Sequence, residues 1–172
     1  MTNKLQIKLL SDNATLPTRN HNTDAGFDIY AAETVILEPQ EKALIATDIA
    51  VNIPKGYMGL LTSRSGVSSK THLVIETGKI DAGFHGNMKI NIKNDSQMNV
   101  ATGAFGFGDY LNVKGEKITD TNSSIGETYQ INKGDKLAQL VIVPIITPEL
   151  QKVEEFTSES ERGGKGFGSS GY

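Results

Sequence analysis

The chain has 172 residues, a formal net charge of −3 and no cysteine. This length fits a single domain over 1–172, and the lack of cysteine excludes a disulfide framework, a thiolate zinc site, an iron-sulfur cluster and a cysteine nucleophile. The 17 Lys and Arg against 20 Asp and Glu argue against a broad binding surface for duplex nucleic acid or an anionic membrane, so neither is an expected partner.

Short runs of alternating or β-branched residues recur along the chain, and turn-forming residues bound nearly all of them. The runs lie at 4–10, 26–31, 34–37, 42–51, 56–62, 73–76, 88–94, 127–131 and 136–145. Turn signals recur about every eight to twelve residues, which predicts an all-β sandwich or barrel. One short helix is expected over 65–70, where Ser63 or Ser65 can cap a turn.

The most apolar stretch, 137–146, is far shorter than a membrane span and contains Gln139. The first ten residues lack the apolar core of a signal peptide. A cytoplasmic protein is therefore expected.

Residues 95–128 interrupt the strand rhythm with polar and glycine-rich sequence, which predicts a surface excursion. Phe105, Phe107 and Tyr110 lie close together within it. Aromatic side chains on a loop either fold back on the domain or meet a partner, and both readings stay open here. The glycines of this segment do not fit a dinucleotide-binding fingerprint.

The segment SRSGVSSK at 63–70 has the composition of an anion site, because small hydroxyl residues and one Arg lead into the predicted helix. The N–H groups of Ser65 and Gly66, with the forked charge of Arg64, suit a phosphate group. The alternative is a capped turn with a solvated arginine.

The segment GKIDAGFHG at 78–86 predicts a hairpin whose turn presents Asp81 and Phe84. An ionised carboxylate at such a place can orient and deprotonate a water molecule, which makes Asp81 a candidate general base. The alternative is an ordinary Asp-Ala-Gly turn with no catalytic role.

Two further segments carry polar groups at strand positions. Asp24 and Asp28 begin the run at 24–31, where either carboxylate can lie near a Mg²⁺ ion that bridges phosphates, or can serve only as a turn cap or exposed strand residue. Gln139 lies among apolar residues of 134–140 and must find a hydrogen-bond partner, which an edge or ligand position would supply.

The C-terminal segment 162–172 has five glycines in eleven residues and also carries Arg162 and Phe167. It can close as a lid over phosphates and a base, or it can be a disordered terminus. A plain flexible linker has no need of an arginine and an aromatic ring.

The five segments 24–31, 63–70, 78–86, 134–140 and 162–172 resemble, in order and spacing, the five motifs of the homotrimeric dUTPase family. The resemblance covers the chain except for an insert at 95–128. It implies a distorted jelly-roll subunit, a homotrimer and active sites built from several chains, each closed by a mobile arm at 162–172. The implied reaction is hydrolysis of dUTP to dUMP and pyrophosphate with Mg²⁺.

The resemblance also implies roles for single residues. Asp81 would position the water that attacks the α-phosphorus, and Asp28 would meet the Mg²⁺ through water. The substrate-binding residues implied by the family are Arg64, Ser65, Gly66, Gly78, Lys79, Ile80, Phe84, Lys89, Gln139, Arg162, Phe167, Gly168, Ser169 and Ser170.

The chain departs from the family pattern at four places. Phe84 replaces a usual Tyr, Ser63 a common Pro and Ile75 a frequent Asn, and the insert is longer than most members carry. The insert is similar to those of dUTPases from temperate phages of Gram-positive bacteria. That similarity implies a second role, the binding of a pathogenicity-island repressor.

Two other functions compete with a dUTPase. One is a nucleotide-sensing regulatory protein without turnover. The other is a relative of dCTP deaminase, which would need a glutamate proton shuttle near the hairpin, where Glu76 is the only glutamate.

Overall fold

The computed structural model describes residues 4–98, 100–101, 104–105, 108–123, 126–160 and 163–164. The described strands of the first half are β1 (Gln6–Leu9), β2 (Gly26–Tyr30), β3 (Val35–Leu37), β4 (Lys42–Ala46), β5 (Ile49–Asn52), β6 (Tyr57–Ser63), β7 (Leu73–Ile75) and β8 (Gly78–Ile80). The remaining strands are β9 (Lys89–Asn94), β10 (Val100–Ala101), β11 (Ala104–Phe105), β12 (Gly108–Leu111), β13 (Lys117–Ser123), β14 (Thr128–Ile131) and β15 (Lys136–Pro144).

Helix α1 (Ser65–Ser68) is the only helix in these ranges, so the predicted all-β fold with one short helix is confirmed. The helix is two residues shorter than expected and is held by buried Val67. None of the described helices is long and apolar enough to cross a membrane.

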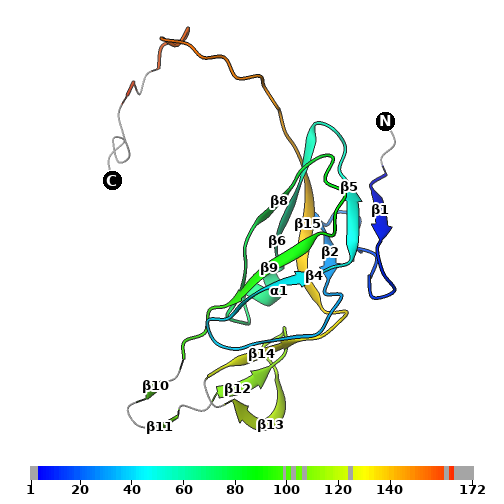
Figure 1. Ribbon diagram of the computed structural model, residues 1–172, viewed down its shortest axis with the longest axis vertical. Helices are drawn as coiled ribbons and strands as arrows, with labels where there is room; N and C mark the ends of the chain where they lie inside the picture. The colour runs from blue at the N-terminus through cyan, green and yellow to red at the C-terminus, as the bar shows by residue number, and fades with distance from the viewer. Residues whose placement is uncertain are drawn as a thin grey trace.

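Three sheets form the body of the domain, and each joins strands that are distant in sequence. Their strand orders are β2-β15-β6-β8, β4-β9-β7 and β13-β12-β14-β3, with β1-β5 and β10-β11 as two-stranded ribbons. All pairings are antiparallel except that of β12 with β14. Figure 1 shows β12, β13 and β14 at one end of the long axis, while the chain after β15 leaves from the other end.

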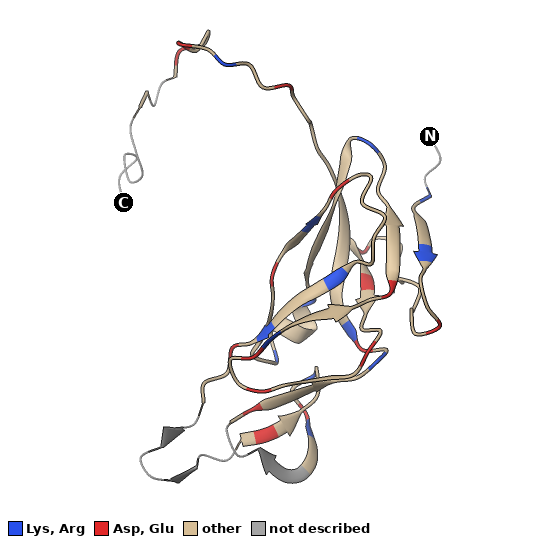
Figure 2. Ribbon diagram, viewed as in Figure 1, with Lys and Arg blue, Asp and Glu red and all other residues tan. Residues whose placement is uncertain are grey.

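The hydrophobic core lies between the inner faces of these sheets. Along β9, Ile90 and Ile92 point inward while the residues between them are partly exposed, as the period of a half-buried strand requires. The first sheet contributes Ile29, Leu61 and Leu140, each no more than 2% exposed. Basic and acidic residues are interspersed over the ribbon in Figure 2, consistent with the near balance of charge.

The single strand expected at 42–51 is wrong, because the chain changes sheets within it. β4 pairs with β9, whereas β5 pairs with β1. Between them Asp48 adopts a φ of 51°, and the Thr47 hydroxyl donates a hydrogen bond to the Met88 carbonyl. The positive φ turns the backbone, so the apolar runs on the two sides belong to different pairings.

The interpretation of 95–128 as a surface excursion outside the strand rhythm is wrong in part. β12 and β13 form a hairpin that joins the sheet of β14 and β3. Leu111 and Val113 are 9% and 8% exposed and belong to the core. The insert from β12 onward is therefore built into the domain, whereas β10 and β11 pair only with each other.

Candidate functional site

The centre of the candidate site is a cluster of three charges, Asp28, Arg64 and Lys136, called here the Asp28 triad. Arg64 Nε donates to Asp28 Oδ1 over 2.7 Å, and Lys136 Nζ lies 3.0 Å from Asp28 Oδ2. Arg64 Nη1 also donates to the carbonyl of Lys136 over 3.2 Å. These contacts join the end of β6 to the start of β15 and fix the guanidinium beside α1.

Asp28 is 4% exposed and is charged because both of its partners are cations. Burial raises the pKa of this carboxyl, but the hydrogen bond from Lys136 and the charge of Arg64 outweigh that effect, so the pKa lies below its ordinary value. The hydrogen bond to Asp28 in turn raises the pKa of Lys136 above its ordinary value. The triad therefore holds two positive charges and one negative charge at neutral pH.

Gln139 faces the same side of the sheet as Asp28. The register sets Gln139 opposite Asp28 on one neighbouring strand and opposite Thr62 on the other, and directly paired residues share a face. Within the described ranges, the side-chain amide of Gln139 makes no hydrogen bond. This polar group, expected to need a partner, is free to bind a ligand beside the Asp28 triad.

Ser65 and Gly66 open α1 next to Arg64, as the anion-site reading requires. Arg64 has extended backbone angles at the cap position and makes no side-chain cap, so the expected serine-capped turn is not formed. A Cβ atom on Gly66 would meet nothing within 4 Å, and this position faces open space. The first N–H groups of a helix have no intrahelical partner, so both backbones can donate to a ligand there.

A cavity of about 470 Å³ lies between α1, the β14–β15 turn and the insert. Its lining residues are Arg64, Gly66, Val67, Lys70, Val113, Lys114, Gly134, Asp135 and Lys136. This volume is within the usual range of ligand sites, and the basic side chains in its wall suit an anion.

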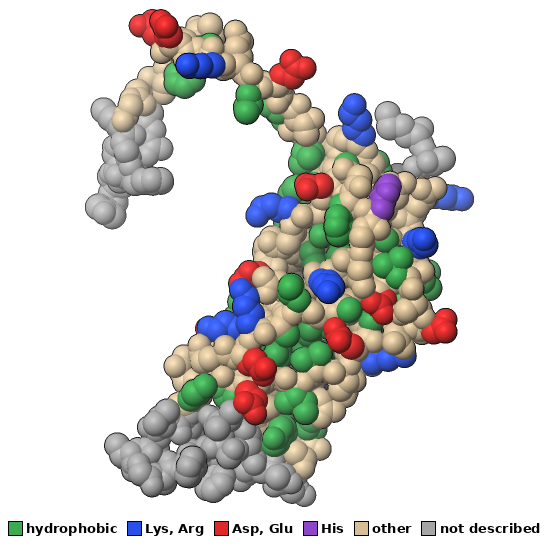
Figure 3. Space-filling view, viewed as in Figure 1, with side chains coloured by type: hydrophobic (Ala, Val, Ile, Leu, Met, Phe, Trp, Pro, Cys, Tyr) green, Lys and Arg blue, Asp and Glu red, His purple; other side chains and the backbone are tan. Residues whose placement is uncertain are grey.

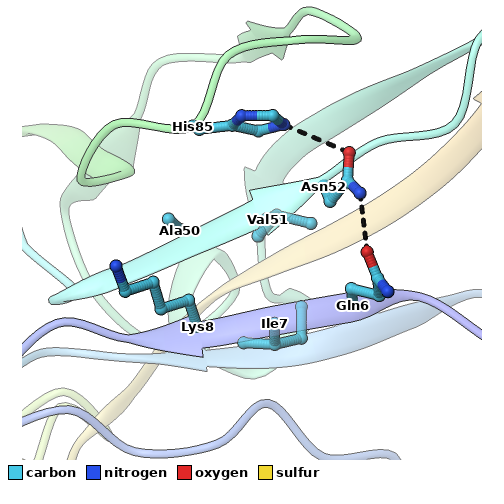
Figure 4. Close-up of a pocket in the computed structure, with 7 residues that line it drawn as sticks. All are labelled: Gln6, Ile7, Lys8, Ala50, Val51, Asn52 and His85. Carbon is cyan, nitrogen blue, oxygen red and sulfur yellow. Dashed lines mark hydrogen bonds between the residues drawn. The ribbon is translucent and has the colours of Figure 1, made fainter.

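Residues 81–86 form a turn, called here the Asp81 turn, with Asp81 and Phe84 both exposed. The predicted hairpin is wrong, because β8 before the turn pairs with β6, whereas β9 after it pairs with β4 and β7. The N–H of Phe84 donates to the Asp81 carbonyl over 3.1 Å, Gly83 has a φ of +94°, and the Phe84 ring packs on Gly86. Figure 4 shows the end of this turn tied to the strands beside it. His85 Nε2 is 3.1 Å from Asn52 Oδ1, and Asn52 Nδ2 donates to Gln6 Oε1 over 2.7 Å.

Within one chain, the Asp81 turn and the Asp28 triad lie at opposite ends of β6. Ile80 pairs with Gly59 near the start of β6, whereas Arg64 follows its last residue. At about 3.3 Å per residue, this register separates Asp81 from Arg64 by roughly 20 Å along the strand. Gly78, Lys79 and Ile80 occupy β8 and Lys89 begins β9, so the structure does not gather these residues around the triad either.

Five predicted residues of the C-terminal segment lie outside the described residues: Arg162, Phe167, Gly168, Ser169 and Ser170. Lys136, in contrast, is a site residue that sequence reasoning missed. It begins a strand whose next two residues are fully buried. Its side chain is 34% exposed, so the local sequence carried no sign that it pairs with a buried carboxylate.

The donor set fits Mg²⁺ only when the ion keeps its own waters or is bound through a ligand. Three or more His, Asp or Glu side chains do not converge anywhere in the described part of the chain. Both oxygens of Asp28 already accept from cations, which disfavours direct contact with a divalent ion. Lone pairs remain on each oxygen, so Asp28 can still accept from a metal-bound water.

The fold and this site define an all-β protein with a preformed cluster of cations beside a cavity. The comparisons give the family: the dUTPase family matches residues 12–104 and 116–171. The chain belongs to the dUTPase family, the dUTP diphosphatases.

Three relatives show how close the match is. A dUTPase of Staphylococcus bacteriophage 80alpha with dUpNHpp is 64% identical, with a TM-score of 0.89 over 99% of this chain and all of that one. A phage phi11 variant with a coordinated structural Mg(II) ion is 65% identical, with a TM-score of 0.81 over 91% of this chain and all of that one. Deoxyuridine 5'-triphosphate nucleotidohydrolase of Mycolicibacterium gilvum is 34% identical over 99% of this chain and 97% of its own length.

The predicted jelly-roll fold, the enzyme class and Mg²⁺ as cofactor are confirmed by these relatives. The roles assigned to single residues stay predictions. The chain spans 55% of the human mitochondrial enzyme, which is 32% identical to it.

Proposed function

We propose that this chain hydrolyses dUTP to dUMP and pyrophosphate in sites shared between the subunits of a homotrimer. The observation that carries the shared site is the separation of Asp81 from Arg64 along β6. Water activation and phosphate binding must meet within a few ångströms of the same phosphorus. The Asp81 turn of one subunit therefore meets the Asp28 triad and Gln139 of another.

The chemistry follows from the groups at each part. The Asp81 carboxylate accepts a proton from a water molecule as the water oxygen bonds to the α-phosphorus. The bond from that phosphorus to the bridging oxygen breaks, and pyrophosphate leaves. Arg64 keeps guanidinium N–H groups beyond the two that bind Asp28 and the Lys136 carbonyl, and these donate to phosphate oxygens with the N–H groups of Ser65 and Gly66.

The other predicted residues bind the nucleoside and the phosphate chain. Gly78, Lys79 and Ile80 present a rigid strand edge to the uracil, and Phe84, 45% exposed, offers its ring to the sugar. Gln139 donates to the phosphate chain, and Lys89 lines the same site from β9. Arg162, Phe167, Gly168, Ser169 and Ser170 close it as the arm at 162–172.

Mg²⁺ supplies charge neutralisation on the phosphate oxygens when it is bound. Asp28 would hold it through a water molecule, because lone pairs remain on its oxygens beside the two ion pairs. The burial of Asp28 keeps this acceptor fixed, because its carboxylate cannot turn away without breaking two ion pairs.

Exposed apolar residues support the trimer. After β15 the chain runs away from its own domain, and Ile146, Leu150 and Phe156 of this C-terminal tail are 90%, 99% and 89% exposed. Figure 3 shows apolar side chains spaced along the tail. A run of such residues is favourable only when another surface covers them, and a neighbouring subunit supplies that surface.

Subunit mixing tests the shared site. Asp81→Asn removes the base, and Gln139→Glu sets a negative charge against the phosphates; each homotrimer is expected to be inactive. Mixed trimers, formed by joint refolding of equal amounts, should regain activity in roughly a quarter of their sites. Random assembly pairs an intact Asp81 turn with an intact binding face at that frequency. Pyrophosphate release by the mixture at the level of the separate variants contradicts the proposal.

A second role concerns the insert. Two variants of the phage 80alpha dUTPase bear on it: one is linked to control of the transfer of virulence genes by a proto-oncogenic G protein-like mechanism, and the other to SaPI inducing capacity. We extend that role here to the binding of a pathogenicity-island repressor through the insert at 95–128. Deleting 100–122 would remove Leu111 and Val113 from the core, so deletion of 100–105 is the cleaner variant. Unchanged capture of the repressor after this deletion would place its binding elsewhere.

A further inference from the structure

The turn between β12 and β13, residues 112–116, brings part of the insert to the phosphate-binding face. Asn112 organises this turn, because its Oδ1 accepts from the N–H groups of Lys114 and Glu116 over 2.9 and 3.0 Å. Its own N–H donates to the Glu116 carbonyl over 2.9 Å. Such side-chain to backbone bonds give the turn a defined shape.

Two features hold the 112–116 turn against the domain, one in the core and one at the segment that follows α1. Val113 is 8% exposed and packs in the core. Gly115 has a φ of +74°, and a Cβ atom there would lie 2.3 Å from the Lys70 carbonyl oxygen, so the two backbones are in close contact. The position of Lys114 is therefore fixed at its backbone, and its exposed side chain moves only about this anchor.

The cavity that this turn helps to line has an unbalanced charge. Four cations face one carboxylate in its wall: Arg64, Lys70, Lys114 and Lys136 against Asp135. Arg64 and Lys136 are paired with Asp28, and Asp135 accepts the Asn132 N–H over 2.8 Å.

Lys70 and Lys114 remain available. In the described part of the chain, neither has an ion-pair partner. They line the same cavity as Arg64 and Lys136, so an anion in the cavity meets the charges of all four cations. The lining contains no aromatic side chain, which favours a phosphate chain over a nucleobase as occupant.

We propose that Lys114, supplied by the insert, binds the phosphates beyond the α-position of the nucleotide together with Lys70. This inference rests on the proposed dUTPase site and adds a binding residue to it. The insert is then part of nucleotide recognition as well as a surface for a partner. Because Lys114 is exposed and its side chain is long, the contact contributes modestly to affinity.

Calorimetric titration of the full chain with dUpNHpp and with dUMP, in the presence of Mg²⁺, tests this role. Lys114→Ala should weaken dUpNHpp binding about 3- to 5-fold, the upper range for an exposed charged contact, and change dUMP binding less than about 1.5-fold. Lys114→Arg should stay within about 1.5-fold of the native chain for both ligands. Lys55→Ala, an exposed lysine in the turn before β6 that does not line the cavity, is the matched control and should change neither.

The outcomes distinguish the Lys114 contact from the dUTPase site on which it rests. Unchanged dUpNHpp affinity in Lys114→Ala overturns the inference while leaving the dUTPase site intact. Equal weakening of dUpNHpp and dUMP overturns it too, because a phosphate contact beyond the α-position cannot affect dUMP. A native chain that binds neither ligand would instead refute the proposed site itself.

Discussion

Asp28→Asn is the substitution whose effect the structure predicts in most detail. The side chain keeps its size but loses its charge, so Arg64 and Lys136 are left without their common carboxylate. Removing one partner of a fully buried ion pair costs about 3–5 kcal/mol, whereas exposed pairs contribute about 0–1 kcal/mol. The Asp28 side chain is 6% exposed, but those of Arg64 and Lys136 are 25% and 34% exposed, and water can reach both cations.

The expected loss therefore lies between these limits, at about 2 kcal/mol of unfolding free energy. In a chain of this size, that loss lowers Tm by roughly 4–8 °C. Thermal unfolding followed by circular dichroism, at one fixed protein concentration, measures it. The concentration is held because association shifts the apparent stability of an oligomer.

Two controls make the reasoning refutable. Lys136→Met should lower the unfolding free energy by about 1 kcal/mol less in the Asp28→Asn background than in the native chain. The reason is that Lys136 has already lost its carboxylate partner in that background. The decrease in Tm caused by Asp28→Asn should be the same with Mg²⁺ and with a chelator, because the ion pairs lie within the protein. A Tm within about 1 °C of the native value, or a loss seen only with Mg²⁺, would refute the stabilising role of the triad.

Three further predictions concern the triad, the buried Asn94 and the insert turn. The folded pKa of Asp28 lies below its unfolded pKa of about 3.9, so its charge stabilises the fold above that pH, and the stabilisation is lost as pH falls through the folded pKa. The Tm values of the native and Asp28→Asn chains should therefore converge in acid and differ at pH 7. Asn94→Ala should cost about 3 kcal/mol in urea unfolding, because this fully buried side chain donates to the Leu37 and Glu127 carbonyls and accepts from Ser96; a loss under about 1 kcal/mol contradicts that account. Gly115→Ala should cost about 1–3 kcal/mol and increase cleavage of the insert in limited proteolysis, since a Cβ atom meets the Lys70 carbonyl at a positive φ; an unchanged digestion pattern would show that the turn tolerates it.

Local sequence patterns predicted the fold class because each run has the period of its element. β9 alternates inward Ile90 and Ile92 with outward residues, and α1 falls within the one expected helical segment. The boundaries that failed depend on pairing with distant strands. Nothing in 42–51 shows that β4 pairs with β9 and β5 with β1, because the partners are remote in sequence.

The insert was misread for a related reason. Leu111 and Val113 stand among Gly, Asn and Lys, a composition typical of a surface loop, yet both belong to the hydrophobic core. Whether an isolated apolar residue is buried depends on what the rest of the chain places over it. Lys136 was missed because its carboxylate lies 108 positions earlier, across a strand pairing that the segment itself does not reveal.

The predicted site residues fall into two groups, those that one chain brings together and those that it keeps apart. Asp28, Arg64 and Gln139 converge because strand register brings them to one face of one sheet, and the motifs that carry them could be ranked from sequence. Asp81 was equally prominent in the sequence, yet the register of β8 on β6 places it at the far end of that sheet. One domain thus holds the two parts of the proposed site about 20 Å apart along β6. A rotation that sets the Asp81 turn of one subunit against the binding face of the next would complete every site in a closed ring. The enzyme would then be active only when assembled, and dilution below the dissociation range of the trimer should abolish turnover before it unfolds the subunit.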